Sequence, residues 1–152
     1  AYVADLSVKD IMDVLELRAC LDGMATSLAA KRITQDEIKE LKHIHTQFIN
    51  YVNKDNLQGS IKKDVEFHDV IYRSSRNERL IQITSNLREQ VQRFRVIYLK
   101  DYSSSRGIIN EHNEIIDALI EKDSSKAQEV AQKHIKNQQE TIINSLKENR
   151  IV

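Results

Sequence analysis

The absence of proline is the feature that most constrains the fold of this chain. Its 152 residues contain no proline and only three glycines, at positions 23, 59 and 107. Because proline and glycine are the residues that most strongly oppose a helical backbone, little in the sequence would stop helices from running long. A chain of this length buries enough surface for one core. We therefore expect a single all-α domain over residues 1–152.

Apolar residues recur with helical periodicity in six segments, which short polar clusters separate. Ser7 is expected to cap a helix from about Val8 to Lys31, and a capping box from Thr34 to Glu37 begins the second helix. The other four helices are expected at about 60–74, 77–100, 106–122 and 124–149. Short connections favour antiparallel neighbours, so we predict an antiparallel bundle of six to seven helices. The apolar stripe predicted for the first helix comprises Val8, Ile11, Met12, Leu15, Leu17, Leu21, Met24 and Leu28.

Four side chains that bind metals well lie on stripes that should face the core. Asp64 and His68 are one turn apart in the third segment, among apolar neighbours. His112 lies on the stripe of the fifth segment and His134 on that of the sixth, and each is 11 residues from the turn at Asp123. Because all helices rise equally per residue, an antiparallel hairpin brings these two imidazoles to the same height.

Three imidazole nitrogens and one carboxylate oxygen suit a divalent transition metal such as Zn, Ni, Mn or Fe, and they leave coordination positions for water or a ligand. This set predicts a central pocket for a metal and a ligand. The periodicity also fits a simpler interpretation, because inward histidines are often hydrogen-bonded core residues. Asp64 and His68 also have the spacing of a simple i, i+4 side-chain pair.

The other two histidines do not extend this pattern. Glu40 and His43 form a single Glu-x-x-His sequence, which di-iron bundles need twice, and no second copy occurs. We therefore expect His43 at the surface and His45 partly buried.

Charge and hydropathy exclude several functions. Lysine plus arginine and aspartate plus glutamate number 23 each, so the chain has no broad basic surface for nucleic acid or an anionic membrane. No apolar run approaches the roughly 18 residues that span a bilayer, and the first ten residues lack the pattern of a signal peptide. The single cysteine, Cys20, cannot form an internal disulfide. These features predict a cytoplasmic protein with no membrane partner.

Three sets of residues form an ordered pattern along nearly the whole chain. The first set is the run Leu15, Glu16, Leu17 and Arg18, with Ala29 and Ala30 before the capped second helix. The middle set comprises Asp64, Phe67, His68, Asn77 and Leu80. The last set comprises Glu111, His112, Ile115, Ala118, Asp123, Ala127 and His134. In their order and spacing, these sets resemble the FCD domain of GntR-type transcription regulators of the FadR branch.

The resemblance implies a ligand set and partners. In the metal-binding members of the family, the residues that correspond to Asp64, His68, His112 and His134 hold the metal. The family also implies a homodimer, a small carboxylate effector, and contact with DNA only through an N-terminal winged-helix domain that is absent from this chain. Many relatives carry glutamate where this chain has Asp22.

Three residues are candidates for effector binding, because an arginine opposite a metal can hold a carboxylate. Arg18 matches the arginine of the family's first helix, although a surface ion pair with Asp22 is the alternative. Arg95 and Tyr98 lie beside or on the apolar stripe of segment 77–100, where Tyr98 is also explained as a core residue with its hydroxyl at the rim. Arg93 is expected to face solvent.

The predicted function is metal-dependent sensing of a small organic acid, without enzymatic activity. One alternative is a metal-dependent enzyme, because an open site of three histidines and one aspartate can activate water. Glu66 and Glu111 are the obvious base candidates, but neither shares a helix face with a predicted ligand. Another alternative is a helical interaction module with a structural metal.

Overall fold

The computed structural model describes residues 7–151, and it describes their side chains except at 102–104 and 149–151. Within that range the backbone forms seven helices and no strand, which confirms the predicted all-α class. The helices are α1 (Val8–Arg32), α2 (Gln35–Asn53), α3 (Leu57–Ser74), α4 (Glu78–Asn86), α5 (Arg88–Lys100), α6 (Tyr102–Ile120) and α7 (Ser124–Ile151).

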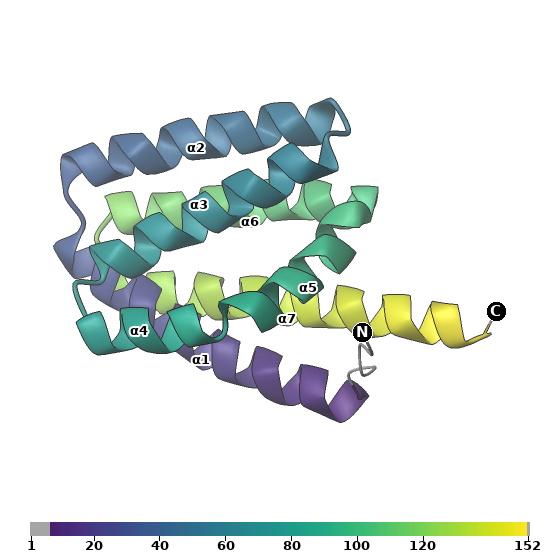
Figure 1. Ribbon diagram of the computed structural model, residues 1–152. Coiled ribbons are helices and arrows are strands. Elements are labelled where there is room, and N and C mark those ends of the chain that lie inside the picture. The colour runs from purple at the N-terminus through teal and green to yellow at the C-terminus, as the bar shows by residue number, and fades with distance from the viewer. Residues whose placement is uncertain (1–6, 152) are drawn as a thin grey trace.

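The helices form a bundle in which α2 and α1 lie at opposite edges, with α3, α6 and α7 between them (Figure 1). The most extensive pairing joins α1 to α7, followed by α2 to α3. Helix α7 extends past its neighbours at its C-terminal end (Figure 1). None of the described helices combines the length and apolar character needed to cross a membrane.

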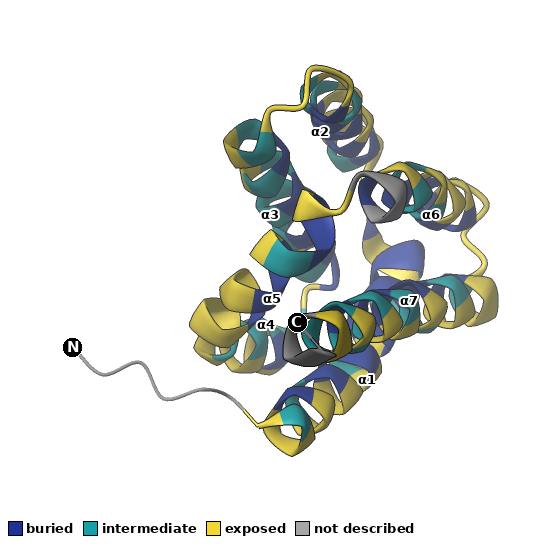
Figure 2. Ribbon diagram, turned by 90° about the vertical axis from the view of Figure 1, so that its right-hand side faces the viewer, coloured by how far each residue is buried: buried dark blue, intermediate teal, exposed yellow. Residues whose placement is uncertain are grey.

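The interior has two apolar clusters, and a layer of buried polar residues separates them. On α1, Ile11 and Leu15 belong to one cluster and Ala29 and Ala30 to the other. The buried polar residues between them on α1 are Arg18, Asp22 and Thr26. The same sequence of apolar, polar and apolar positions recurs on α2, α3, α6 and α7. Buried faces of the helices point toward one another and exposed faces point outward (Figure 2).

The stripe predicted for the first helix is wrong at three of its positions, whereas Leu21 and Leu28 do pack against the core. Met12, Leu17 and Met24 are 42%, 46% and 48% exposed, so they lie on the outer face of α1. Beyond Leu15, the buried positions of α1 carry small or polar side chains. At Gly23 an added β-carbon would lie 2.8 Å from Cγ of Gln132, so the small residue permits the close approach of α7.

The single helix predicted over 77–100 is two helices that meet at Leu87. The amide of Leu87 bonds the carbonyl of Thr84, a shorter connection than the α-helical one. The hydroxyl of Thr84 contacts the carbonyls of Leu80 and Ile81, and side-chain bonds of this kind bend helices. The side-chain bonds of Thr84 therefore account for a bend just before Leu87.

Three turns pass through a left-handed residue that is not glycine. Asp55, Arg76 and Lys122 have φ of 54°, 51° and 56°, after α2, α3 and α6 respectively. This conformation lets the chain reverse directly after a helix, and glycine usually supplies it. The glycine-poor sequence thus makes its turns with polar residues.

Gly59 and Gly107 should respond in opposite directions to substitution by alanine. A β-carbon on Gly59 would overlap the ring of Tyr51, whereas one on Gly107 would meet no atom within 4 Å among the described residues. Gly59→Ala should therefore lower the free energy of unfolding by about 1–3 kcal/mol. Gly107→Ala should raise it by roughly 0.5–1 kcal/mol, because alanine favours the helix. Urea unfolding of both variants tests this, and a stabilising Gly59→Ala would contradict the packing described.

Candidate metal centre

The three histidines predicted as metal ligands come together in the polar layer. They lie on α3, α6 and α7, and each is at most 4% exposed. One nitrogen from each of His68, His112 and His134 lies within 4.8 Å of the corresponding nitrogen of the other two. The rings of His112 and His134 are 5.2 Å apart between centroids, as their equal spacing from Asp123 predicts.

Asp64 lies beside this group and contacts two of its members. Its Oδ1 is 3.5 Å from Nε2 of His68 and 3.2 Å from Nε2 of His112. With metal bonds of about 2.1 Å, adjacent ligand atoms are about 3.0 Å apart in octahedral and about 3.4 Å apart in tetrahedral coordination. Both distances therefore suit ligands of one ion. Asp64 forms no ion pair with His134 among the described contacts, so the fourth predicted ligand is less centrally placed than the histidines.

The donor set itself favours a metal, because several of these atoms have no other partner. Asp64 Oδ1, His68 Nε2 and His112 Nε2 are buried and form no hydrogen bond within the described structure. Leaving buried polar atoms unpaired costs about 1–3 kcal/mol each. A metal ion would satisfy all three atoms together, so the residues present fit a divalent ion.

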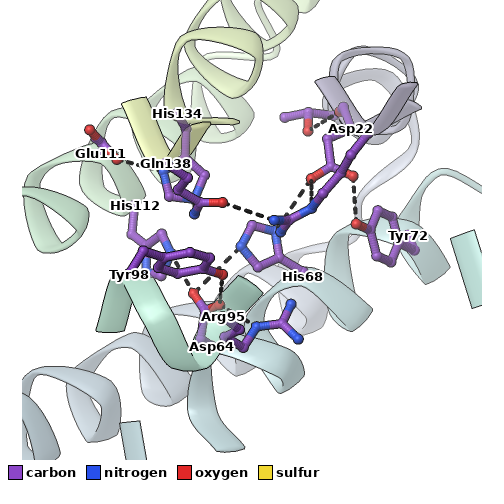
Figure 3. Close-up of polar contacts among 12 residues, drawn as sticks. Asp22, Asp64, His68, Tyr72, Arg95, Tyr98, Glu111, His112, His134 and Gln138 are labelled. Carbon is purple, nitrogen blue, oxygen red and sulfur yellow. Dashed lines mark hydrogen bonds and ion pairs between the residues drawn. The ribbon is translucent and has the colours of Figure 1, made fainter. Parts of the chain in front are cut away.

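The other oxygen of Asp64 is held by two of the predicted effector residues. Arg95 Nε donates to Asp64 Oδ2 over 2.7 Å, and the Tyr98 hydroxyl donates to it over 3.0 Å (Figure 3). Burial alone would raise the pKa of Asp64, but His68, His112 and Arg95 hold that pKa well below its usual value. Burial and the Asp64 charge raise the pKa of Tyr98 to about 12. Asp64 is thus a carboxylate, and Tyr98 is a neutral donor.

Glu111 orients His134. Its Oε1 is 2.6 Å from His134 Nδ1, and its Oε2 accepts a bond from Asn137. A carboxylate on one imidazole nitrogen fixes the tautomer and directs the other nitrogen toward a metal. This contact gives Glu111 a positioning role rather than that of the base considered from the sequence. Glu66, the other candidate base, pairs with Lys63.

Arg18 lies inside the polar layer rather than at the surface. It is 2% exposed, and its Nε lies 3.4 Å from Asp22 Oδ2, so the predicted ion pair exists but is buried. Tyr72 donates to the other oxygen of Asp22. Arg18 Nη1 donates to Gln138, while Nε and Nη2 form no hydrogen bond within the described structure. An arginine with unused donors at this depth can receive an anion.

Two residues differ from the expectation or were not foreseen. His45 is 4% exposed, not partly buried, because its ring packs against Phe67 and His112. Gln138 is buried and contacts both Arg18 and His134. It is four residues after His134, so the same helical spacing rule identifies it.

His43 and Arg93 are exposed, as predicted.

A cleft leads from the surface to one side of the centre. It lies between α3, α4 and α5 and has a volume of about 260 Å³. The residues that line it include His68, Tyr72, Thr84, Arg88 and Arg95. A small ligand could therefore approach the histidines beside Arg95.

Stability should fall as the pH is lowered below 6.5, with a chelator present. Burial lowers the pKa of His45, His68 and His112 from 6.5, so below this pH the unfolded chain binds protons that the folded chain does not. Each such histidine contributes a slope of up to about 1.4 kcal/mol per pH unit. Urea unfolding at pH 7.5, 6.5 and 5.5 measures the slope.

His45→Leu should flatten this pH dependence, whereas His43→Leu is a matched control at an exposed position of the same helix. An equal slope in wild type and His45→Leu would show that His45 is not held neutral by burial.

Known proteins are similar to this chain in sequence and in fold. The chain is 26% identical over 144 residues to the Nta operon transcriptional regulator of Aminobacter aminovorans. This match covers 91% of this chain and 64% of that protein. Streptococcus agalactiae GntR superposes with a TM-score of 0.76 at 23% identity, covering 91% of this chain and 61% of that one. E. coli McbR/YncC superposes with a TM-score of 0.82 at 18% identity, and the match covers 96% of this chain and 72% of that one. The chain thus spans less than two thirds of the length of the Aminobacter aminovorans and Streptococcus agalactiae proteins.

The family follows from a more specific match. A family model described as the FCD domain matches residues 13–137, so the chain belongs to the FCD domain family. This match confirms the resemblance to the FCD domain that the sequence predicts. The Aminobacter aminovorans relative is a transcriptional regulator, which agrees with the prediction that the chain is not an enzyme.

Proposed function

We propose that this chain is a metal-dependent sensor of small organic acids. The observation that carries the proposal is the group of three buried histidines beside Asp64, whose unpaired atoms fit a divalent ion. His68, His112, His134 and Asp64 would hold the metal. Bound there, the metal would supply a Lewis-acidic centre that accepts oxygen ligands. Zinc, nickel, manganese and iron all suit this donor set.

The charges around the centre favour an anionic effector. Arg95 pairs with Asp64 and Arg18 lies beside Asp22, so these four buried groups are neutral in sum. A divalent ion therefore adds positive charge that they do not cancel, although Glu111 compensates part of it at the edge of the layer. A small carboxylate would restore the balance.

Arg18 is the best supported of the three effector residues, because its Nε and Nη2 have no hydrogen-bond partner in the described structure. Arg95 and Tyr98 already hold Asp64, and their first role on this proposal is to orient that carboxylate. Arg95 also lines the cleft, where it can meet a ligand on its way to the centre.

The wider role rests on the relatives. We propose that the chain acts within a cytoplasmic regulator, and that effector binding controls a DNA-binding domain outside the 152 residues. The regulators named above are longer than the matched region, which supports this division. We also propose a homodimer, since Leu17 and Met24 expose apolar surface on one face of α1.

Metal binding should depend on His134. After loading and desalting, elemental analysis should find close to one equivalent of transition metal in the wild type, and much less in His134→Ala with unchanged helical circular dichroism. His43→Ala is the control, because that histidine is exposed. Chelation should lower the melting temperature, since a metal at one hundred times its Kd stabilises the folded state by about 2.7 kcal/mol. Full metal content in His134→Ala would remove this residue from the centre.

The effector should require both the metal and Arg18. Calorimetry of the metal-loaded protein with small hydroxy- and dicarboxylates should identify a ligand whose affinity falls strongly after chelation. Arg18→Met keeps the side-chain bulk but removes the charge-assisted hydrogen bond, so affinity should fall at least about tenfold with metal content unchanged. Arg93→Met, at an exposed site, should have no effect. Equal binding to the chelated protein would make the metal structural and the sensing proposal wrong.

A further inference from the structure

Gln138 connects two parts of the polar layer. It is 1% exposed and lies on α7, one turn after His134. Its side chain lies beside His134 (Figure 3), and its nitrogen is 2.9 Å from Nε2 of that ring. Its oxygen accepts a hydrogen bond of 2.8 Å from Arg18 Nη1. It lies one residue beyond the part of the chain that matches the FCD domain.

The chemistry of the neighbours fixes the direction of both bonds. A guanidinium only donates, so the oxygen of Gln138 must face Arg18 and its NH2 group must face His134. His134 Nε2 therefore accepts the bond through its lone pair. The Nδ1 of the same ring then carries the proton, which it donates to Glu111. One arrangement of protons thus satisfies the whole row of side chains, which runs through Arg18, Gln138, His134 and Glu111.

A metal ion would need the lone pair that Gln138 uses. Because Glu111 holds Nδ1, His134 can bind a metal only through Nε2, and one lone pair cannot serve an amide proton and a metal together. We propose that the amide of Gln138 competes with the metal for His134, and that its displacement by the metal also frees Arg18. This inference rests on the metal centre proposed above.

The release of Arg18 would link the two binding events. Its Nη2 has no hydrogen-bond partner in the described structure, and its Nε has only the ion pair with Asp22 Oδ2 at 3.4 Å. Loss of the Gln138 oxygen would add the Nη1 donor to those open to an anion. A guanidinium with more open N–H groups offers a carboxylate more charge-assisted hydrogen bonds. Metal binding would thus prepare the anion site through one side chain.

The first test uses zinc alone and the full 152-residue protein. Competition against a chromophoric chelator should show that Gln138→Leu binds zinc about three- to tenfold more tightly than wild type, because a neutral competing hydrogen bond is lost. Gln128→Leu, at an exposed position on α7, should match the wild type. Unchanged or weaker zinc binding by a folded Gln138→Leu would overturn the inference.

The second test needs no variant and therefore does not depend on its folding. In nuclear magnetic resonance spectra of the wild type, saturating zinc should shift the side-chain amide protons of Gln138 and speed their exchange with water. The Arg18 guanidinium resonances should change with them. If zinc binds and the Gln138 amide stays as it was, the competition does not exist.

The two levels of the proposal fail differently. A wild type that binds no zinc, or a His134→Ala variant that binds it equally well, overturns the metal centre and the role of Gln138 with it. Binding that depends on His134 but leaves the Gln138 amide unmoved overturns only the inference about Gln138.

Discussion

The buried carboxylate of Asp64 is the contact on which the arrangement of the polar layer depends. It is 0% exposed and its two oxygens face different partners, with Arg95 and Tyr98 on one and His68 and His112 on the other. Removing one partner from a buried ion pair costs about 3–5 kcal/mol, because a charge is left without compensation. Helices α3, α5 and α6 must therefore meet at this point, and their heights relative to one another are set there.

The two apolar clusters offset the cost of burying this polar layer. Burying charged groups stabilises a fold less than apolar packing of the same volume would, so the free energy of folding has to come from the clusters on either side. In return, the layer restricts sliding of the helices, because a shift by one turn would bring Asp64 or Arg18 against apolar neighbours. The residues best placed to bind a ligand are thus also those that determine the alignment of the bundle.

Periodicity predicts those parts of this structure that depend on position along one helix. His112 and His134 face each other because they are equally distant from the turn between their helices. Gln138 contacts His134 because it lies one turn further along the same helix. Beyond Leu15, the inner face of α1 could not be predicted by ranking hydrophobicity, because small and charged residues fill it while Leu17 is exposed. The pairing of Arg95 with Asp64 joins separate helices and leaves no local signal in the sequence.

The location of Arg18 and Gln138 suggests how a binding event would reach the rest of the chain. They lie on α1 and α7, the pair of helices with the most extensive contact, which approach closely where Gly23 meets Gln132. A ligand shifts a conformational equilibrium only through contacts that differ between the two states. The bond between Arg18 and Gln138 is a contact of this kind on our proposal, because it exists only while Gln138 also occupies His134. Occupancy of the centre would therefore act first on the packing of α1 against α7.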